Sequence, residues 1–179
     1  MMKPPLISLV GLSGSGKTTI VVKLVEYFAN AGFRVGTIKH SCHPHPLDAK
    51  GKDSWRHKEA GAERTLFVGP ERMQLVADVE SELSPVELAG DLLKDMELVI
   101  VEGFLQSNTP KIEVVRSERS LEPVSTPENG LLAIVSDIAA DKLPEYPGHE
   151  IPRIEINDIE AIAEFIKGHL GLAEPDGKS

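Results

Sequence analysis

The chain carries a phosphate-binding motif between its first apolar run and its first helical pattern. Residues 11–18 read Gly-Leu-Ser-Gly-Ser-Gly-Lys-Thr and match the pattern G-x-x-x-x-G-K-[S/T] at every fixed position. The glycines allow the backbone to curl with its amide hydrogens pointing inward, and the following helix adds the positive end of its dipole. Such a loop binds a di- or triphosphate. We therefore predict nucleotide binding, the alternative being a Gly-rich turn without a ligand.

Each residue of this loop has a predicted role toward a bound nucleotide. Lys17 is the predicted catalytic cation, because its ammonium group can reach the β and γ phosphates. Thr18 is a predicted magnesium ligand through its hydroxyl group. The predicted nucleotide-binding residues of the loop are Gly11, Ser13, Gly14, Ser15, Gly16, Lys17, Thr18 and Thr19.

Three acidic residues are candidates to complete the magnesium and hydrolysis site. Glu102 directly follows four apolar residues, Leu98 to Val101, so it stands at the carboxyl end of a buried strand, where α/β sheets bind ligands. It is the second predicted metal ligand, unless it is simply a solvated strand-end carboxylate. Asp48 and Asp53 are catalytic candidates that would position the attacking water, although loop aspartates are often only turn residues.

The base of the nucleotide is harder to infer from the residues. A carboxylate suits guanine, because it can accept hydrogen bonds from the ring N–H and the exocyclic amine. Asp137 follows the apolar run 131–135 and resembles the end of the NKxD guanine signature, although Ile134 and Val135 stand where Asn and Lys would be. Asp137 is therefore the predicted guanine-binding residue, the alternative being a cap on the next turn.

The elements that must position these residues alternate between short apolar strands and helical patterns. This alternation predicts an α/β fold, a sandwich of the P-loop NTPase type with a mostly parallel sheet and helices on both faces. We expect one nucleotide-binding domain over residues 1–172 and a flexible tail over 173–179. The expected strands cover residues 6–10, 34–39, 65–68, 73–77, 98–101, 111–115, 131–135 and 153–156, and the expected helices begin near residues 17, 53, 85 and 158.

Composition narrows the location and the partners. The chain has 28 Asp plus Glu against 19 Lys plus Arg, a net charge of −9, which argues against nucleic-acid binding. Cys42 is the only cysteine, so no intramolecular disulfide can form and a reducing compartment is indicated. The apolar runs are far shorter than the roughly 20 residues that span a bilayer. We predict a cytoplasmic protein that does not bind membranes.

The segment from Lys39 to Arg64 differs from the rest of the chain in charge. Its six Lys or Arg and four acids give it a net charge of +2, whereas the segment from Glu71 to Glu102 has a net charge of −7. The loop from His40 to Lys52 adds three histidines and Cys42, a set that is poorly spaced for a tetrahedral metal site. A basic patch that recruits a second anion and an ordinary solvated loop both fit this pattern.

Taken together, these motifs resemble those of one known family, the molybdopterin-guanine dinucleotide biosynthesis adapter proteins called MobB. The resemblance covers most of the chain and is far more specific than the phosphate-binding motif alone. The segments that carry it are the phosphate-binding loop, residues 38–40, 51–54, 60–62 and 99–104, Lys111 and Ile112 with Arg116, residues 136–137 and residues 156–158. Cys42, Lys50 and Leu105 depart from the family pattern, and the change at Leu105 removes a potential anion contact. Leu12 stands where a related subgroup of P-loop proteins has a lysine, so no intersubunit lysine contact is expected from this loop.

The resemblance implies a function beyond nucleotide binding. It implies a dimeric, Mg²⁺-dependent GTP-binding adapter with weak GTPase activity, which assists the nucleotidyltransferase MobA in attaching GMP to molybdopterin. Whether the loop from His40 to Lys52 holds pterin, phosphate or a metal is left open. The main alternative is a P-loop small-molecule kinase, in which Arg116 or Arg119 would stabilise the transferring phosphoryl group. A structural partner with a vestigial nucleotide site is the third possibility.

Overall fold

The computed structural model describes residues 3–43, 48–79, 81 and 83–175, and the chain divides into two compact units. The first unit comprises Met1–His40 and Ser84–Ser179, and the second comprises Ser41–Leu83. Hydrophobic periodicity did not anticipate this subdivision, and the assignment of residues 1–172 to one nucleotide-binding domain stays a prediction. Part of the predicted tail, residues 176–179, lies outside the described residues.

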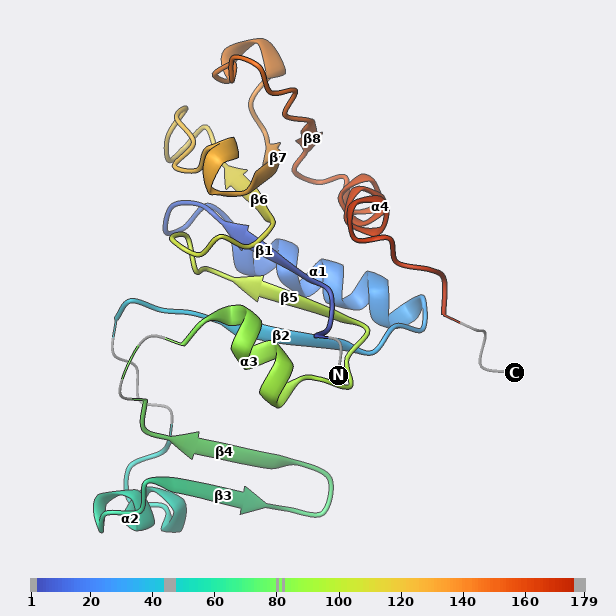
Figure 1. Cartoon of the computed structure of the whole chain (residues 1–179). Coiled ribbons are helices and arrows are strands. Elements are labelled where there is room, and N and C mark those ends of the chain that lie inside the picture. Colours follow the sequence, from blue (N-terminus) through green and yellow to red (C-terminus); the bar gives the residue numbers. More distant parts are fainter. Residues whose placement is uncertain (1–2, 44–47, 80, 82, 176–179) are drawn as a thin grey trace. The chain divides into compact units, whose positions relative to one another are not determined.

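The first unit is built on a parallel sheet that has six strands in the described part of the chain (Figure 1). The spatial order is β2-β5-β1-β6-β7-β8, and every neighbouring pair is parallel. The carboxyl ends of all these strands therefore meet at one edge of the sheet. The strands are β1 (Leu6–Val10), β2 (Val35–Lys39), β5 (Leu98–Glu102), β6 (Lys111–Val115), β7 (Leu131–Ser136) and β8 (Arg153–Glu155).

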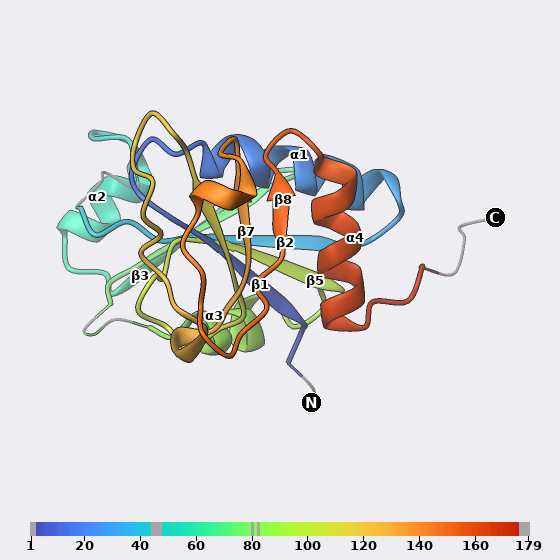
Figure 2. The same cartoon turned by 90° about the horizontal axis from the view of Figure 1, so that it is seen from above.

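Helices cover both faces of this sheet, which confirms the predicted α/β class (Figure 2). The helices α1 (Lys17–Asn30) and α4 (Ile159–Leu170) pack on one face, where Leu9 and Ile100 contribute to the larger core. The helix α3 (Pro85–Leu92) packs on the other face, against Val99 and Val101. The first four residues of β5, Leu98 to Val101, thus point alternately to opposite faces and are all apolar, as a strand buried on both sides requires.

Local sequence signals explain where the helices begin and end. Ser84 caps α3 by accepting a hydrogen bond from the Val86 amide, and its own amide donates to the Glu87 carboxylate, so residues 84–87 form a capping box at the expected helix start near residue 85. Asp158 caps α4 through the Ala161 amide. Two short 3₁₀ turns, Pro127–Asn129 and Ala140–Lys142, lie in the connections before and after β7.

The second unit consists of a short helix and a hairpin. The helix α2 covers Asp53–Glu59, and the strands β3 (Arg64–Val68) and β4 (Met73–Ala77), both expected from the sequence, pair antiparallel in a sheet of their own. Lys58 links the helix to the hairpin, because its ammonium group donates to the Ala62 carbonyl oxygen at 2.5 Å and to the Asp78 carboxylate at 2.6 Å.

None of the helices in the described part of the chain has the length and apolar character needed to span a bilayer.

Candidate functional site

The phosphate-binding motif forms the turn between β1 and α1. The three glycines of the motif, Gly11, Gly14 and Gly16, have φ angles of 134°, 76° and 91°. Residues with a side chain rarely adopt such positive φ angles. A Cβ atom on Gly11 would lie 2.4 Å from the carbonyl oxygen of Val114. The loop therefore rests against β6 at a distance that only glycine permits, and the motif has the strand–loop–helix context that it needs to bind phosphate.

Lys17 lies at the start of α1 with its side chain folded across the loop. Its ammonium group donates to the carbonyl oxygens of Gly11 and Leu12 at 2.9 and 2.8 Å. Burial lowers the pKa of Lys17, and the nearby Glu102 carboxylate opposes that shift. Phosphate oxygens could replace these two carbonyl acceptors without a change in the backbone, and a doubly charged group would offset the cost of burying the ammonium.

Thr18 and Glu102 come together as the sequence predicted for a magnesium site. The Thr18 hydroxyl donates to Glu102 Oε1 at 2.7 Å, although the two residues are 84 positions apart. Parallel pairing explains the contact, because β5 lies next to β1 and both strands end at the same edge. The Glu102 side chain is only 12% exposed, so its charge is directed at this cluster rather than at bulk solvent.

Lys39 is a third member of the cluster. Its ammonium group lies 3.1 Å from Glu102 Oε1 and 3.3 Å from the Thr18 hydroxyl. A positive charge therefore stands at the two oxygen atoms that would contact a metal ion. A hydroxyl and a carboxylate are the hard oxygen ligands that Mg²⁺ prefers, with phosphates and waters completing its coordination. The chemistry of this pair fits magnesium.

The remaining predicted residues of the loop differ in exposure. Ser13 and Thr19 are exposed. Ser15 is buried, and its hydroxyl has no hydrogen-bond partner within the described residues. An unpaired buried hydroxyl costs free energy, so a phosphate oxygen that accepted from Ser15 would remove that cost.

Asp137 stands at the end of β7, on the same edge of the sheet. Its carboxylate accepts from the Ser117 amide at 2.8 Å and from the Ser117 hydroxyl at 3.2 Å. The alternative role, a cap on the turn after β7, belongs instead to Ser136, whose hydroxyl accepts from the Ile138 amide. The carboxylate is exposed and keeps further lone pairs for a ligand, so its predicted role toward guanine stays a prediction.

Asp48 and Asp53 belong to the second unit, whereas the phosphate-binding loop belongs to the first. Asp48 Oδ1 accepts from the Ala49 amide, whereas Oδ2 is buried without a partner among the described residues. Asp53 begins α2 and lies 3.9 Å from the Arg56 guanidinium. Lys17 belongs to the first unit, so it shares a unit with neither aspartate, and the catalytic roles of Asp48 and Asp53 stay predictions.

The histidines next to Cys42 were considered as metal ligands in the sequence, and the structure describes His40 and His43 of this group. Within the described residues, no group of three or more His, Cys, Asp or Glu side chains is arranged to hold a metal ion. His40 stacks on Phe104 instead, with 4.3 Å between the ring centroids. Residues 44–47, which include His45, lie outside the described part of the chain.

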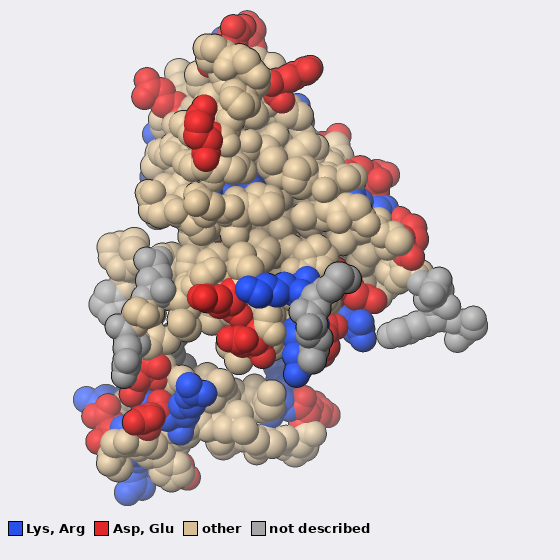
Figure 3. Space-filling model, in the orientation of Figure 1, with Lys and Arg blue, Asp and Glu red and all other residues tan. Residues whose placement is uncertain are grey.

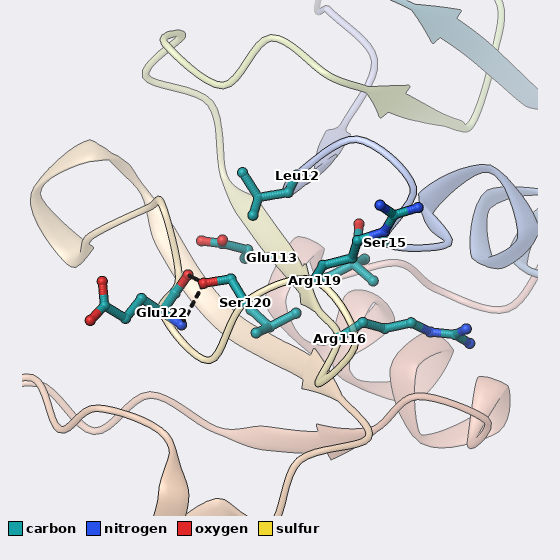
Figure 4. A pocket seen from close by; sticks show the side chains of 9 residues that line it. Leu12, Ser15, Glu113, Arg116, Arg119, Ser120 and Glu122 are labelled. Carbon is teal, nitrogen blue, oxygen red and sulfur yellow. Dashed lines mark hydrogen bonds between the residues drawn. The ribbon is translucent and has the colours of Figure 1, made fainter.

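Two residues of the site were not predicted from the sequence. Lys39 was assigned only to a basic patch, but it contacts the Thr18–Glu102 pair. Glu113 was read as an ordinary strand residue, but its carboxylate lies in a small pocket beneath the phosphate-binding loop (Figure 4). This pocket is lined by Leu12, Ser15, Glu113, Val114, Val115, Arg116, Arg119, Ser120 and Glu122. The sequence signal that could have indicated this role is the position of Glu113 between the apolar residues Ile112 and Val114.

The parallel order of the sheet and the glycine-rich turn between β1 and α1 define the P-loop class of α/β proteins. A family model described as "Molybdopterin guanine dinucleotide synthesis protein B" (MobB) matches residues 6–137. The chain belongs to the MobB family.

Individual relatives agree with this assignment. A molybdopterin-guanine dinucleotide biosynthesis adapter protein from Haemophilus influenzae is 37% identical, over 93% of this chain and 89% of the relative. The protein of the same name from Escherichia coli is 31% identical, over 90% of this chain and 91% of the relative. A crystal structure of molybdopterin-guanine biosynthesis protein B matches with a TM-score of 0.67 and 27% identity, over 93% of this chain and 99% of that one.

Proposed function

We propose that this protein binds GTP with Mg²⁺ and acts as an adapter in the synthesis of molybdopterin guanine dinucleotide, where it assists MobA in attaching GMP to molybdopterin. The observation that carries the proposal is the Thr18–Glu102 contact of 2.7 Å beside a complete phosphate-binding loop. Membership of the MobB family supports the biosynthetic role. The loop alone would support nucleotide binding of any kind.

Magnesium has a defined place in this proposal. Thr18 and Glu102 would hold the ion, directly or through water, and the ion would neutralise the charge of the bound phosphates. Lys39 would then contribute its positive charge to the phosphates, since its ammonium group already lies within 3.3 Å of both oxygen atoms. Weak GTP hydrolysis belongs to the same proposal, with Lys17 as the catalytic cation and Asp48 and Asp53 as candidates to position the attacking water.

Asp137 is the residue that we propose for guanine selection, and a nucleotide titration tests both this role and the function. Calorimetry with Mg·GTP and Mg·ATP should show GTP binding more tightly to the parent protein. Replacing Asp137 by asparagine should reduce the preference for GTP about tenfold or more, because an amide oxygen can accept only one of the two guanine hydrogen bonds well.

The variant Ser117→Ala is the matched control for this titration. It removes the 3.2 Å hydrogen bond from the Ser117 hydroxyl to Asp137 while leaving the carboxylate in place. Its preference for GTP should equal that of the parent. A parent protein that failed to bind Mg·GTP would contradict the proposed function, whereas equal binding of GTP and ATP would contradict only the role of Asp137.

The hairpin of the second unit supports a homodimer. Leu66 pairs with Leu75, and Val68 pairs with Met73, so these four side chains share one face of the hairpin. They are 47–73% exposed. A two-stranded sheet is only marginally stable by itself, and an apolar face of this kind is normally covered. A second copy of the chain is the proposed cover.

Light scattering tests the dimer. The parent protein should have roughly twice the chain mass of 19.4 kDa, and Val68→Asp should shift it toward the monomer. Leu92→Asp is the control, because Leu92 is 60% exposed on α3, in the first unit, and its replacement should leave the mass unchanged. A monomeric mass for the parent at micromolar concentration would contradict the dimer.

The partners and the compartment follow from the same proposal. On the face shown in Figure 3, acidic and basic side chains are interspersed rather than gathered into one basic area, in keeping with a net charge of −9. This distribution favours protein and nucleotide partners over nucleic acid. The proposed compartment is the reducing cytoplasm, where an exposed free thiol such as that of Cys42 would stay reduced.

A further inference from the structure

Two arginines of the segment that follows β6 lie near the phosphate-binding loop, and Figure 4 shows the Arg119 side chain reaching it. A Cβ atom on Gly14 would lie 2.4 Å from Arg119 Nη2 and 2.8 Å from Arg119 Cζ. A Cβ atom on Gly16 would lie 3.7–3.9 Å from the guanidinium of Arg116. The Arg119 guanidinium therefore rests on the main chain of the loop at Gly14, where a side chain would collide with it, and the Arg116 guanidinium lies beside the loop at Gly16.

Neither arginine has an anionic partner within the described residues. No ion pair or side-chain hydrogen bond is formed by Arg116 or Arg119 in this part of the chain, although Glu118 and Glu122 are close in sequence. The Nε atom of Arg116 is buried without an acceptor. A buried, unpaired donor beside a polyphosphate-binding loop indicates that a ligand supplies the acceptor.

The segment that carries the arginines is fixed at both ends by carboxylates. At its start, Asp137 accepts from the Ser117 amide and hydroxyl at 2.8 and 3.2 Å. At its end, Glu113 accepts from the Val124 and Ser125 amides at 2.6 and 2.7 Å. The arginines thus extend from a held segment, which lowers the entropy that is lost when they bind a ligand.

The strand order tells which end of a nucleotide these arginines face. Glu102, which belongs to the magnesium cluster at the terminal phosphates, comes from β5, on one side of β1. Arg116 and Arg119 follow β6, on the other side of β1, and Asp137 follows β7 beyond it. A nucleotide with its β and γ phosphates toward Glu102 must therefore direct its α phosphate, ribose and base toward the arginines.

We propose that Arg116 and Arg119 bind the nucleoside half of the nucleotide, from the α phosphate to the base, and this inference rests on the proposed function. The guanidinium group suits either contact, because its planar fork matches phosphate oxygens and its face stacks on an aromatic ring. The arginines add affinity that GTP and GDP share, and they add none for a polyphosphate without a nucleoside.

Three ligands measured on the same variants test this inference. Arg116→Ala and Arg119→Ala should each weaken the binding of Mg·GTP and Mg·GDP by the same factor, about tenfold, since a charge-assisted hydrogen bond or a stacking contact is lost. Their affinity for Mg·tripolyphosphate, measured by displacement of a fluorescent GDP analogue, should equal that of the parent. Arg119→Lys keeps the charge but loses the planar fork, so it should recover only part of the affinity.

Arg34→Ala is the matched control. Arg34 lies just before β2, at the amino ends of the strands, and pairs with Glu97, so all three affinities should stay at the parent value. Circular dichroism melts should show each variant folded. A loss confined to GTP, an equal loss for tripolyphosphate, or unchanged affinity for GTP and GDP in both alanine variants would overturn the inference. A parent protein that bound no nucleotide would instead overturn the proposed function.

Discussion

Replacing Lys17 by alanine is expected to lower the affinity for Mg·GTP at least about 100-fold. The ammonium group is held by the carbonyl oxygens of Gly11 and Leu12, at 2.9 and 2.8 Å, so it is already placed over the loop that receives the phosphates. Two charge-assisted hydrogen bonds to phosphate, each contributing about 1.5–3 kcal/mol, account for a loss of this size.

The control for this prediction is another lysine of the same helix. Lys23 is exposed on α1, six residues beyond Lys17, and Lys23→Ala should bind Mg·GTP with the parent affinity. Both variants should unfold at nearly the parent urea concentration, because neither side chain belongs to the apolar core. Calorimetry that gave Lys17→Ala the parent affinity would contradict phosphate binding by this loop.

The sequence predicted the fold well where the signal was local. The phosphate-binding loop, the capping box at Ser84 and the apolar strand ending at Glu102 each depend on residues close together in the chain. Their structures follow from backbone freedom, hydrogen-bonding capacity and burial within a few residues. Strand β6 was predicted with the observed limits, Lys111–Val115.

Contacts that depend on strand order could not be predicted in the same way. The sequence placed Glu102 and the residues after Lys111 at the ends of strands, but not on opposite sides of β1. Lys39 joins Glu102 only because β2 is the other neighbour of β5. Such neighbours are set by packing between distant segments, so the positions of Glu102, Lys39 and the segment after β6 around β1 emerge only from the structure.

Charged residues inside β6 were the second point that local patterns missed. Lys111 and Glu113 are almost completely buried, whereas charged residues in a strand usually mark an exposed face. Each is satisfied by main-chain groups of later segments: Lys111 donates to the carbonyl oxygens of Ser107 and Asn129, and Glu113 accepts from two amides. The sequence does not state where such partners lie, so burial of these charges could not be inferred.

Replacing Glu113 by alanine is expected to lower the free energy of unfolding by about 3 kcal/mol. The carboxylate is the acceptor for the Val124 and Ser125 amides, at 2.6 and 2.7 Å, and its removal leaves one partly buried and one buried donor unpaired. Glu113→Gln retains one acceptor oxygen and should lose about 1 kcal/mol. Urea unfolding followed by far-UV circular dichroism measures both changes, and an alanine variant within about 0.5 kcal/mol of the parent would contradict the role of Glu113.

The pH dependence of the free energy of unfolding, compared between the parent protein and Glu113→Gln, tests the buried charge of Glu113 separately. Burial raises the pKa of Glu113 above its ordinary value of 4.5, and the hydrogen bonds from Val124 and Ser125 only partly oppose this shift. The folded state therefore keeps the proton after the unfolded state has released it, so stability falls as the pH rises from 4.5 through the raised pKa. Glutamine does not titrate, so the stability advantage of the parent over Glu113→Gln should shrink across this window. An advantage that grew with pH would show that the two amides outweigh the cost of burying the charge.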